Sequence, residues 1–278
     1  MEFKSRRVYL FDYMEDSMNS ILLENLTWFD VKEFLKKENV VLLPIGSHEQ
    51  HGPHLPLSTD SINVQFLAVQ AAEACQVLVA PTIRVGVSFN HMHFPGTMTL
   101  RPETLVEVIS DMVNSLVAHG FRKVILLNGH GGNNAAIEVA AIKLKENHPR
   151  VVIGVLHSWL LSKEGDKILE SPIRYHADEG ETSRMLVSAK PLVRMERAKK
   201  EIPKSRSGLF NFQITEVFKQ ITFYGLPKTH TVTKSGIFGD ASLATEEKGR
   251  ILFDEAVKNL IQEIEQLKKL NLEDYVEG

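Results

Sequence analysis

The sequence predicts an α/β protein with three layers, in which helices cover both faces of a mostly parallel central sheet. Short apolar runs rich in β-branched residues alternate along the chain with longer amphipathic segments. Two of the runs are hydrophobic throughout, as expected of parallel strands buried on both faces. Repeated strand–helix–strand order produces right-handed crossovers within one sheet. The chain has 278 residues and 43% hydrophobic content, enough for a full core, and we expect residues 1–278 to form a single domain.

The elements follow in order from these runs. Buried strands are predicted for residues 40–45, 77–80, 124–127 and 151–156. Helices are predicted for residues 61–74, 102–119, 133–147 and about 245–270. Pro102 suits a first helical turn, Asn133 or Asn134 suits an N-cap, and Gly120 suits a helix end.

The segment from residue 190 to 233 shows no clear period, and we expect an irregular excursion that serves as an oligomer contact or a lid. Aromatic residues gather within it at 209–212 and 218–224. Because such a group is unusual as fully exposed surface, we predict that it is buried against another subunit of a homo-oligomer.

The charge of the chain points to a small-molecule substrate. A net charge of −3 gives no electrostatic case for binding nucleic acid or an anionic membrane. Residues 1–20 contain acidic residues and lack a continuous apolar core, which argues against a signal peptide or a membrane span. The expected location is therefore the cytoplasm.

Two motifs place side chains that bind metals just after predicted strands. The run GSHEQHGPH covers residues 46–54, and NGHGGN covers residues 128–133. Residues two apart on an extended chain point to the same side, so Glu49 and His51 can face one cavity. Asp60 follows after a proline-rich turn and can add a third ligand, while His130 reaches the same edge from another strand. This pattern predicts a metallohydrolase.

A third motif, HADEGETS at residues 176–183, precedes an apolar segment of helical length. It adds one histidine, His176, and three carboxylates. Glu181 is the carboxylate expected to face inward. Asp178 and Glu179 are expected to be solvated, or to support the ligands from outside.

Four other histidines have weaker claims to the site. His48 is offset by one residue and is expected to point away from Glu49, while His54 is expected to brace the loop. His91 and His93 flank the PGT turn, where lining a substrate pocket and simple loop hydrogen bonding are equally good explanations.

In six segments, taken in order, the chain resembles the creatininase (creatinine amidohydrolase) family. The segments are LTW at 26–28, the run from 46 to Asp60, HFPGT at 93–97, NGHGGN with HADEGETS, and SGIFGD at 235–240. The resemblance implies a creatininase-like α/β/α metallohydrolase domain with a binuclear metal centre, often in a higher oligomer.

The resemblance also implies ligands for two divalent ions. The implied ligands are Glu49, Asp60 and His130 for the first ion, and His51, Asp60 and Glu181 for the second, with Asp60 as the bridge. Creatininase itself has a metal-binding glutamate where this chain has Gly132, so the chain resembles an NGHGGN-type member rather than creatininase. The donor set suits zinc, manganese or iron.

The implied reaction is attack by hydroxide on a carbonyl. Two cations ~3.5–4 Å apart can hold a hydroxide between them and polarise the substrate. His176 matches the family's active-site histidine and is the expected proton donor, and Glu181 is the second expected catalytic residue. The backbone at Gly131 and Gly132 either helps to bind an oxyanion or simply forms a tight turn into the next helix.

The substrate pocket is expected to include His93, Trp159 and Gly131, because Trp159 aligns with a tryptophan near the creatininase active site. Creatininase has a second pocket tryptophan followed by an aspartate where this chain has Pro172 and Ile173, which argues against creatinine. The leading hypothesis is cleavage of a C–N bond in a small cyclic amide.

Two other reactions stay open. One is hydrolytic C–C ring opening of a cyclic diketone, such as an inositol-catabolism intermediate of the 3-dehydro-scyllo-inosose type, and the other is deformylation of a formamide. A non-enzymatic metabolite-binding module is the weakest hypothesis, because none of the expected ligands is missing and the glycine run at 129–132 matches no nucleotide-binding motif.

Overall fold

The computed structural model describes residues 21–202 and 228–271, and its centre is a parallel sheet. The strands of this sheet are β1 (Val40–Ile45), β2 (Leu78–Val79), β3 (Lys123–Asn128) and β4 (Val152–His157). Their order is β2-β1-β3-β4, and every neighbouring pair is parallel. The predicted α/β class with a mostly parallel sheet is therefore confirmed.

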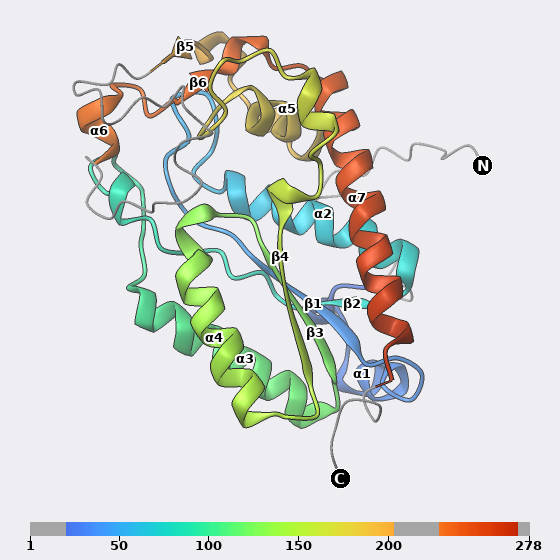
Figure 1. Ribbon diagram of the computed structural model, residues 1–278. Helices are drawn as coiled ribbons and strands as arrows, with labels where there is room; N and C mark the ends of the chain where they lie inside the picture. The colour runs from blue at the N-terminus through green and yellow to red at the C-terminus, as the bar shows by residue number, and fades with distance from the viewer. Residues whose placement is uncertain (1–20, 203–227, 272–278) are drawn as a thin grey trace.

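Helices cover both faces of the sheet (Figure 1). On one face lie α2 (Thr59–Cys75) and α7 (Glu246–Lys269), and on the other lie α3 (Pro102–His119) and α4 (Asn134–Asn147). Alternate side chains of β1 divide between the two cores: Val40 and Leu42 pack with α2 and α7, whereas Val41, Leu43 and Ile45 pack with α3 and α4. Every residue of β1 is buried, which explains its uninterrupted apolar sequence.

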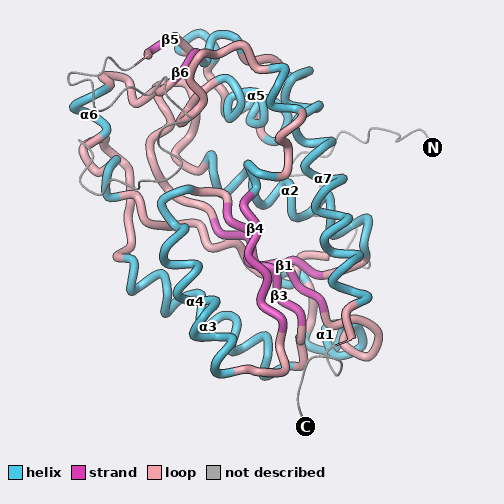
Figure 2. The backbone as a smooth tube through the Cα atoms, in the orientation of Figure 1, coloured by secondary structure: helices cyan, strands magenta, loops and turns pink. Residues whose placement is uncertain are grey.

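The shorter elements complete the molecule (Figure 2). These are α1 (Trp28–Phe34), α5 (Glu179–Ser188), α6 (Thr229–Val232), and an antiparallel pair formed by β5 (Lys200–Glu201) and β6 (Gly239–Asp240). The helix α5 contacts both α7 and α2. Except for α1, these elements gather at the end of the sheet shown at the top of Figure 1, beyond the carboxyl ends of the strands.

Asn133 is the N-cap residue of α4, as predicted, but its side chain has another role. Gly120 ends α3 with a φ of 117°, as expected, but neither predicted asparagine caps α4 with its side chain. The Asn133 amide instead donates to the Gly46 carbonyl and accepts from the Val87 N–H, and Asn134 accepts from Asn128. A 3-10 turn before α4 points these side chains at the sheet, so they connect the loop to β1 and β3.

Several expectations fall outside the described residues. The aromatic groups at 209–212 and 218–224 lie there, as does the segment 1–20, and the homo-oligomer stays a prediction that light scattering can test. Within residues 21–202 and 228–271, no helix has the length and apolar character needed to cross a membrane.

Candidate metal centre

The loop after β1 is pressed against the start of α2, and this contact brings the first ligands together. A Cβ atom at Gly46 would lie 2.5 Å from the Cα atom of Ser61, so only glycine allows this approach. Asp60 lies in the first turn of α2, where the Ser47 hydroxyl donates to its Oδ2 atom at 2.6 Å. The sequence separation between Glu49 and Asp60 is thus closed by backbone packing.

Glu49, Asp60 and His130 form one compact group, which we call the strand-end triad. His130 Nε2 lies 3.3 Å from Glu49 Oε2, and His130 Nδ1 lies 3.1 Å from Asp60 Oδ2. Glu49 follows β1 and His130 follows β3, and these two strands are paired in register up to Ile45 and Asn128. Two neighbouring strands therefore deliver ligands to the same edge of the sheet, as the sequence predicted.

His51, His176 and Glu181 form a second group, the α5-side triad. His51 Nε2 lies 3.7 Å from Glu181 Oε2, and the ring centroids of His51 and His176 are 4.3 Å apart. Glu181 lies in the first turn of α5, where its Oε2 atom accepts from the Ala177 N–H at 2.6 Å. Ala177 has a φ of 49°, so the chain makes a tight left-handed turn between His176 and α5.

Asp60 connects the two triads. Its Oδ1 atom lies 3.0 Å from His51 Nε2, while Oδ2 faces His130. One carboxylate thus turns an oxygen toward each group, which is the arrangement expected of a bridging ligand.

The hydrogen bonds of three histidines fit metal binding. His51 Nδ1 lies 3.1 Å from the Glu49 carbonyl, His130 Nε2 lies 3.0 Å from the Val87 carbonyl, and His176 Nε2 lies 2.7 Å from the Gln50 carbonyl. A carbonyl only accepts, so in each ring that nitrogen carries a hydrogen. The other nitrogen faces Asp60 in His51 and His130 and faces Glu49 in His176, although His130 Nε2 also lies 3.3 Å from Glu49. Metal-binding histidines are typically held in this way by a backbone carbonyl.

Glu49 gives an independent test of whether cations fit the site. Its side chain is fully buried, and neither carboxylate oxygen has a hydrogen-bond partner among the described residues. A buried carboxylate without hydrogen bonds is costly unless cations compensate its charge. The structure therefore fits a group of divalent cations held by these side chains.

The pKa values express the same charge arrangement. Burial lowers the pKa of His51, but Asp60, Glu181 and Glu49 outweigh this effect and raise it to about 10. Burial likewise opposes protonation of His130, yet Glu49 and Asp60 raise its pKa to about 9. In this metal-free arrangement both imidazoles hold protons at the positions where ligands need lone pairs.

Glu181 and His176 shift toward their neutral forms. Burial raises the pKa of the Glu181 carboxyl to about 8, although the nearby His51 opposes this shift. Burial, together with His51 and His91, lowers the pKa of His176 well below its usual value. His176 is therefore a neutral base at physiological pH.

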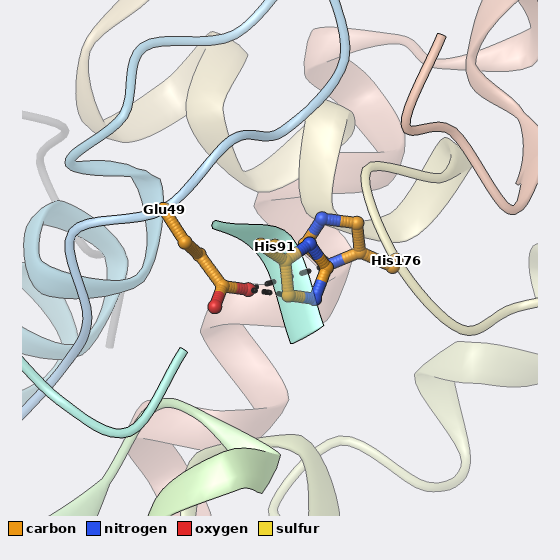
Figure 3. Close-up of side chains that lie close together, drawn as sticks. All are labelled: Glu49, His91 and His176. Carbon is orange, nitrogen blue, oxygen red and sulfur yellow. Dashed lines mark ion pairs between the residues drawn. The ribbon is translucent and has the colours of Figure 1, made fainter. Parts of the chain in front are cut away.

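His91 joins the site although the sequence left its role open. Its Nε2 atom lies 3.7 Å from Glu49 Oε1, and His176 Nδ1 lies 3.6 Å from the same oxygen (Figure 3). Gln50 was not singled out in the sequence, yet its side chain contacts His91 and its backbone holds His176. Membership in the EQH run was the one signal that could have indicated Gln50.

The predicted pocket residues lie outside these groups of possible ligands. His93 is exposed and stacks on His230 of α6 with ring centroids 3.6 Å apart, and Trp159 stacks on His157 at the end of β4. Gly131 leaves open space, since a Cβ atom there would meet nothing within 4 Å. Gly132 is different, because a Cβ atom would lie 2.2 Å from the Val87 carbonyl oxygen. The pocket roles of His93, Trp159 and Gly131 stay predictions.

The remaining polar residues of the motifs serve the fold. His54 is buried and contacts the Thr182 hydroxyl at 2.8 Å, and the His48 carbonyl accepts from the Met98 N–H. Of the two expectations for Asp178 and Glu179, solvation is wrong because both are buried, while support of the ligands from outside stays a prediction. Asp178 caps α5, and Glu179 accepts two backbone N–H groups and pairs with Lys248.

Known proteins are similar to this chain over most of its length. The family described as "Creatininase: Creatinine amidohydrolase" matches residues 24–264. The chain is 28% identical to the 3-dehydro-scyllo-inosose hydrolase of Thermotoga maritima, over 93% of this chain and 86% of that protein. It is 26% identical to the creatinine amidohydrolase of Pseudomonas putida, over 89% and 97% of the two chains. A crystal structure of a protein from Bacteroides fragilis, described as a possible creatinine amidohydrolase, superposes with a TM-score of 0.80 at 27% identity, covering 91% of this chain and 98% of that one.

Proposed function

The chain belongs to the creatininase family and is a hydrolase of that family, and we propose that it depends on two divalent cations and cleaves a C–N bond in a small cyclic amide. The observation that carries the proposal is Glu49, a buried carboxylate whose two oxygens have no hydrogen-bond partner among the described residues and face histidines on either side. Such a carboxylate calls for cations beside it.

The two triads supply the ligands in this proposal. The strand-end triad would hold one ion, and His51 with Glu181 would hold the other, with Asp60 shared between them. When bound, such ions supply a water that ionises near neutral pH and a Lewis acid for the substrate carbonyl. The donors suit zinc, manganese or iron.

His176 is the proton carrier in this proposal. The Gln50 carbonyl holds its Nε2–H group, so the Nδ1 lone pair faces the site. Because its lowered pKa keeps the ring neutral, His176 can accept a proton at Nδ1 from the attacking water and pass it to the leaving nitrogen. Water adds across the C–N bond: its oxygen stays on the carbonyl carbon, and both of its protons end on the leaving nitrogen, which yields a carboxylate and an ammonium group.

The partners of two nearby arginine side chains, Arg174 and Arg184, favour an uncharged substrate. Arg174 donates to the Asp166 carbonyl, and Arg184 donates to Ser162 and pairs with Asp166. The charge of Arg184 is thus already paired, while exposed Arg174 has only a backbone carbonyl as its partner, and we rank a neutral cyclic amide ahead of a phosphate-bearing formamide. Ile173, where creatininase has a pocket aspartate, is buried, which supports a substrate other than creatinine.

Ring opening of a cyclic diketone is the second candidate. The similarity to the Thermotoga maritima 3-dehydro-scyllo-inosose hydrolase, over 93% of this chain, favours it. The attack on a carbonyl is the same in both reactions, but in ring opening the leaving group is a carbon. A proton delivered by His176 would then neutralise an enolate in place of an amine.

Product analysis separates these candidates. Protein loaded with zinc, manganese or iron is offered panels of cyclic amides, formamides and cyclic 1,3-diketones, with Asp60→Asn as the inactive control. A new amine with a carboxylate supports C–N cleavage, and a new carboxylate with a retained ketone supports ring opening. Loaded protein that hydrolyses none of these classes would contradict the proposed function.

A further inference from the structure

Gln50 lies between two proposed ligands, Glu49 and His51, and its side chain has a single possible orientation. Its Oε1 atom accepts from the Gly52 N–H at 2.9 Å, and a backbone N–H can only donate. Its Nε2 atom donates to the Gly236 carbonyl at 3.2 Å, and a carbonyl can only accept. These two backbone groups therefore identify which end of the amide is oxygen and which is nitrogen.

The fixed amide determines where His91 carries its hydrogen. Gln50 Nε2 lies 2.8 Å from His91 Nδ1, and because Nε2 is a donor, Nδ1 must accept. A neutral His91 then carries its hydrogen on Nε2, the nitrogen that faces Glu49 Oε1 at 3.7 Å. This face of His91 offers an N–H group to the site.

The backbone carbonyl of Gln50 holds the hydrogen of His176 on the ring nitrogen that points away from Glu49. The Gln50 carbonyl accepts from His176 Nε2 at 2.7 Å, so the hydrogen of His176 points away from Glu49. The Gln50 amide nitrogen also lies 3.0 Å from His176 Nε2, but its two hydrogens already have acceptors in His91 and Gly236. His176 therefore turns the lone pair of Nδ1 toward Glu49, at 3.6 Å.

Two motifs that the metal centre does not use serve to hold Gln50. Thr97 of the HFPGT run accepts from the Gln50 N–H at 3.1 Å. Gly236 of the SGIFGD run has a φ of 86°, and a Cβ atom there would lie 1.7 Å from Gln50 Oε1. Segments far apart in the sequence thus hold one residue, Thr97 through the Gln50 backbone N–H and Gly236 through the Gln50 side chain.

We propose that Gln50 is a positioning residue that presents an N–H group of His91 and a lone pair of His176 to the same carboxylate, Glu49. In the two rings shown in Figure 3, His91 Nε2 and His176 Nδ1 lie 3.7 Å and 3.6 Å from Glu49 Oε1 but have different roles. His176 can accept a proton or bind a cation through Nδ1, whereas neutral His91 only turns an N–H dipole toward Glu49 and is no ligand. The role given to His176 rests on the proposed function, while the tautomer of His91 does not.

Solid-state ¹⁵N NMR of protein labelled with [¹⁵N]histidine tests the proposal, because protonated and unprotonated ring nitrogens resonate in separate ranges. The measurement uses the full chain, both metal-free and loaded with the diamagnetic probe ion Zn²⁺. Signals of His91 and His176 are assigned from their absence in His91→Gln and His176→Gln. The wild type is expected to show His91 protonated at Nε2 in both states.

Gln50→Glu is the decisive variant. A carboxylate at this position accepts from His91 Nδ1, so the proton should move from Nε2 to Nδ1. Gln50→Met, which neither donates nor accepts there, should leave a mixture of both tautomers and lower kcat by about tenfold or more with a smaller change in KM. Gln65→Glu is the matched control, because Gln65 is also buried but accepts from Arg84 away from His91 and His176.

The outcomes are distinct. A wild-type His91 protonated at Nδ1, a His91 nitrogen shifted by Zn²⁺ coordination, or an unchanged His91 in folded Gln50→Glu would each overturn the proposal. If Gln50→Glu fails to fold, the wild-type spectrum and Gln50→Met still decide. Failure of the proposed function would appear separately, as wild-type protein that binds no Zn²⁺ and hydrolyses nothing, whatever the tautomer of His91.

Discussion

The two halves of the candidate metal centre, the strand-end triad and the α5-side triad, are built in different ways. Every member of the strand-end triad follows a strand of the sheet or begins α2, and Glu49 and Asp60 are at most 5% exposed. The α5-side triad includes Glu181, whose side chain is 29% exposed and is held by the irregular turn at Ala177. Strands of the sheet and the start of α2 thus supply one half, while a loop and a short helix supply the other. We therefore expect substitutions nearby to disturb the strand-end triad less than the α5-side triad.

Asp60→Asn should have the largest effect, because it alters the residue that both halves share. The amide cannot serve two cations and places a donor against His51 or His130. Losing an outer-shell partner of a metal ligand costs roughly 10–100-fold, so the loss of a shared ligand should exceed ~100-fold in activity and remove bound metal. Metal per chain is measured by inductively coupled plasma mass spectrometry. Asp111→Asn, on an exposed position of α3, is the control.

If Asp60→Asn retained two metal equivalents, Asp60 would not be a ligand that the two triads share. The two triads would then not be linked through it. Loss of one equivalent would instead show that Asp60 serves a single half. In that case the variant identifies which half depends on it, because His130→Gln should deplete the strand-end ion and Glu181→Gln the other.

Substitutions at the adjacent glycines Gly131 and Gly132 test the strand-end triad alone. In Gly132→Ala the new Cβ atom would lie 2.2 Å from the Val87 carbonyl oxygen and 2.4 Å from His130 Nε2. Overpacking of this kind typically costs about 1–3 kcal/mol, and here it should also displace His130 and weaken metal binding. Gly131→Ala meets open space and should change stability by less than ~0.5 kcal/mol. Urea unfolding and metal content measure both effects, and equal costs for the two variants would contradict the packing argument.

The difference between residues at strand ends and residues in loops also explains which parts of the site could be predicted from the sequence. Apolar runs located β1 and β3 to within a residue or two at each end, and the polar residues after them located Glu49 and His130, because strand ends meet at one edge of a parallel sheet. His91 lies in a loop without such a periodic pattern. Its place beside Glu49 depends on contacts with Gln50, which follow from tertiary packing alone.

The errors have the same origin. A glutamate next to a helix start, such as Glu179, is usually solvated, but here Lys248 of the distant α7 and two backbone N–H groups compensate its burial. Asparagine commonly caps a helix with its side chain. The Asn133 side chain instead donates to the Gly46 carbonyl and accepts from the Val87 N–H. Local propensity predicts an element and tertiary partners decide where its polar side chains turn.

Metal binding should release protons, and most of them should come from the imidazoles of the two halves. With pKa values raised to about 10 and about 9, His51 and His130 are protonated at pH 7.5 in the metal-free protein and must lose a proton to become ligands. The apparent affinity should therefore rise with pH, by about tenfold per unit for each proton displaced, and level off above pH 9–10. Calorimetry in two buffers with different ionisation enthalpies counts the protons, and heats that do not depend on the buffer would contradict the prediction.

The raised pKa values of His51 and His130 also determine how the stability of the metal-free protein changes with pH. A pKa raised above the ordinary value of 6.5 stabilises the folded state fully below pH 6.5, and this contribution is lost as the pH rises through 9–10. Metal-free protein should therefore lose stability relative to the loaded form as the solution becomes alkaline. Thermal melts of the two forms at pH 6.5 and pH 9.5 measure the difference.

Thr182→Val should have the smallest effect, and it is confined to the α5-side half. The change keeps the shape of the side chain but removes the hydroxyl that contacts His54 at 2.8 Å, which should cost about 0.5–1.5 kcal/mol. Thr82→Val is the matched control, because the buried hydroxyl of Thr82 has no hydrogen-bond partner among the described residues and its removal should be neutral or stabilising. Since Thr182 adjoins Glu181, any loss of metal should be limited to one of two equivalents. Loss of both ions, with unfolding otherwise unchanged, would show that the strand-end half depends on α5 and is less self-sufficient than its position at the sheet edge indicates.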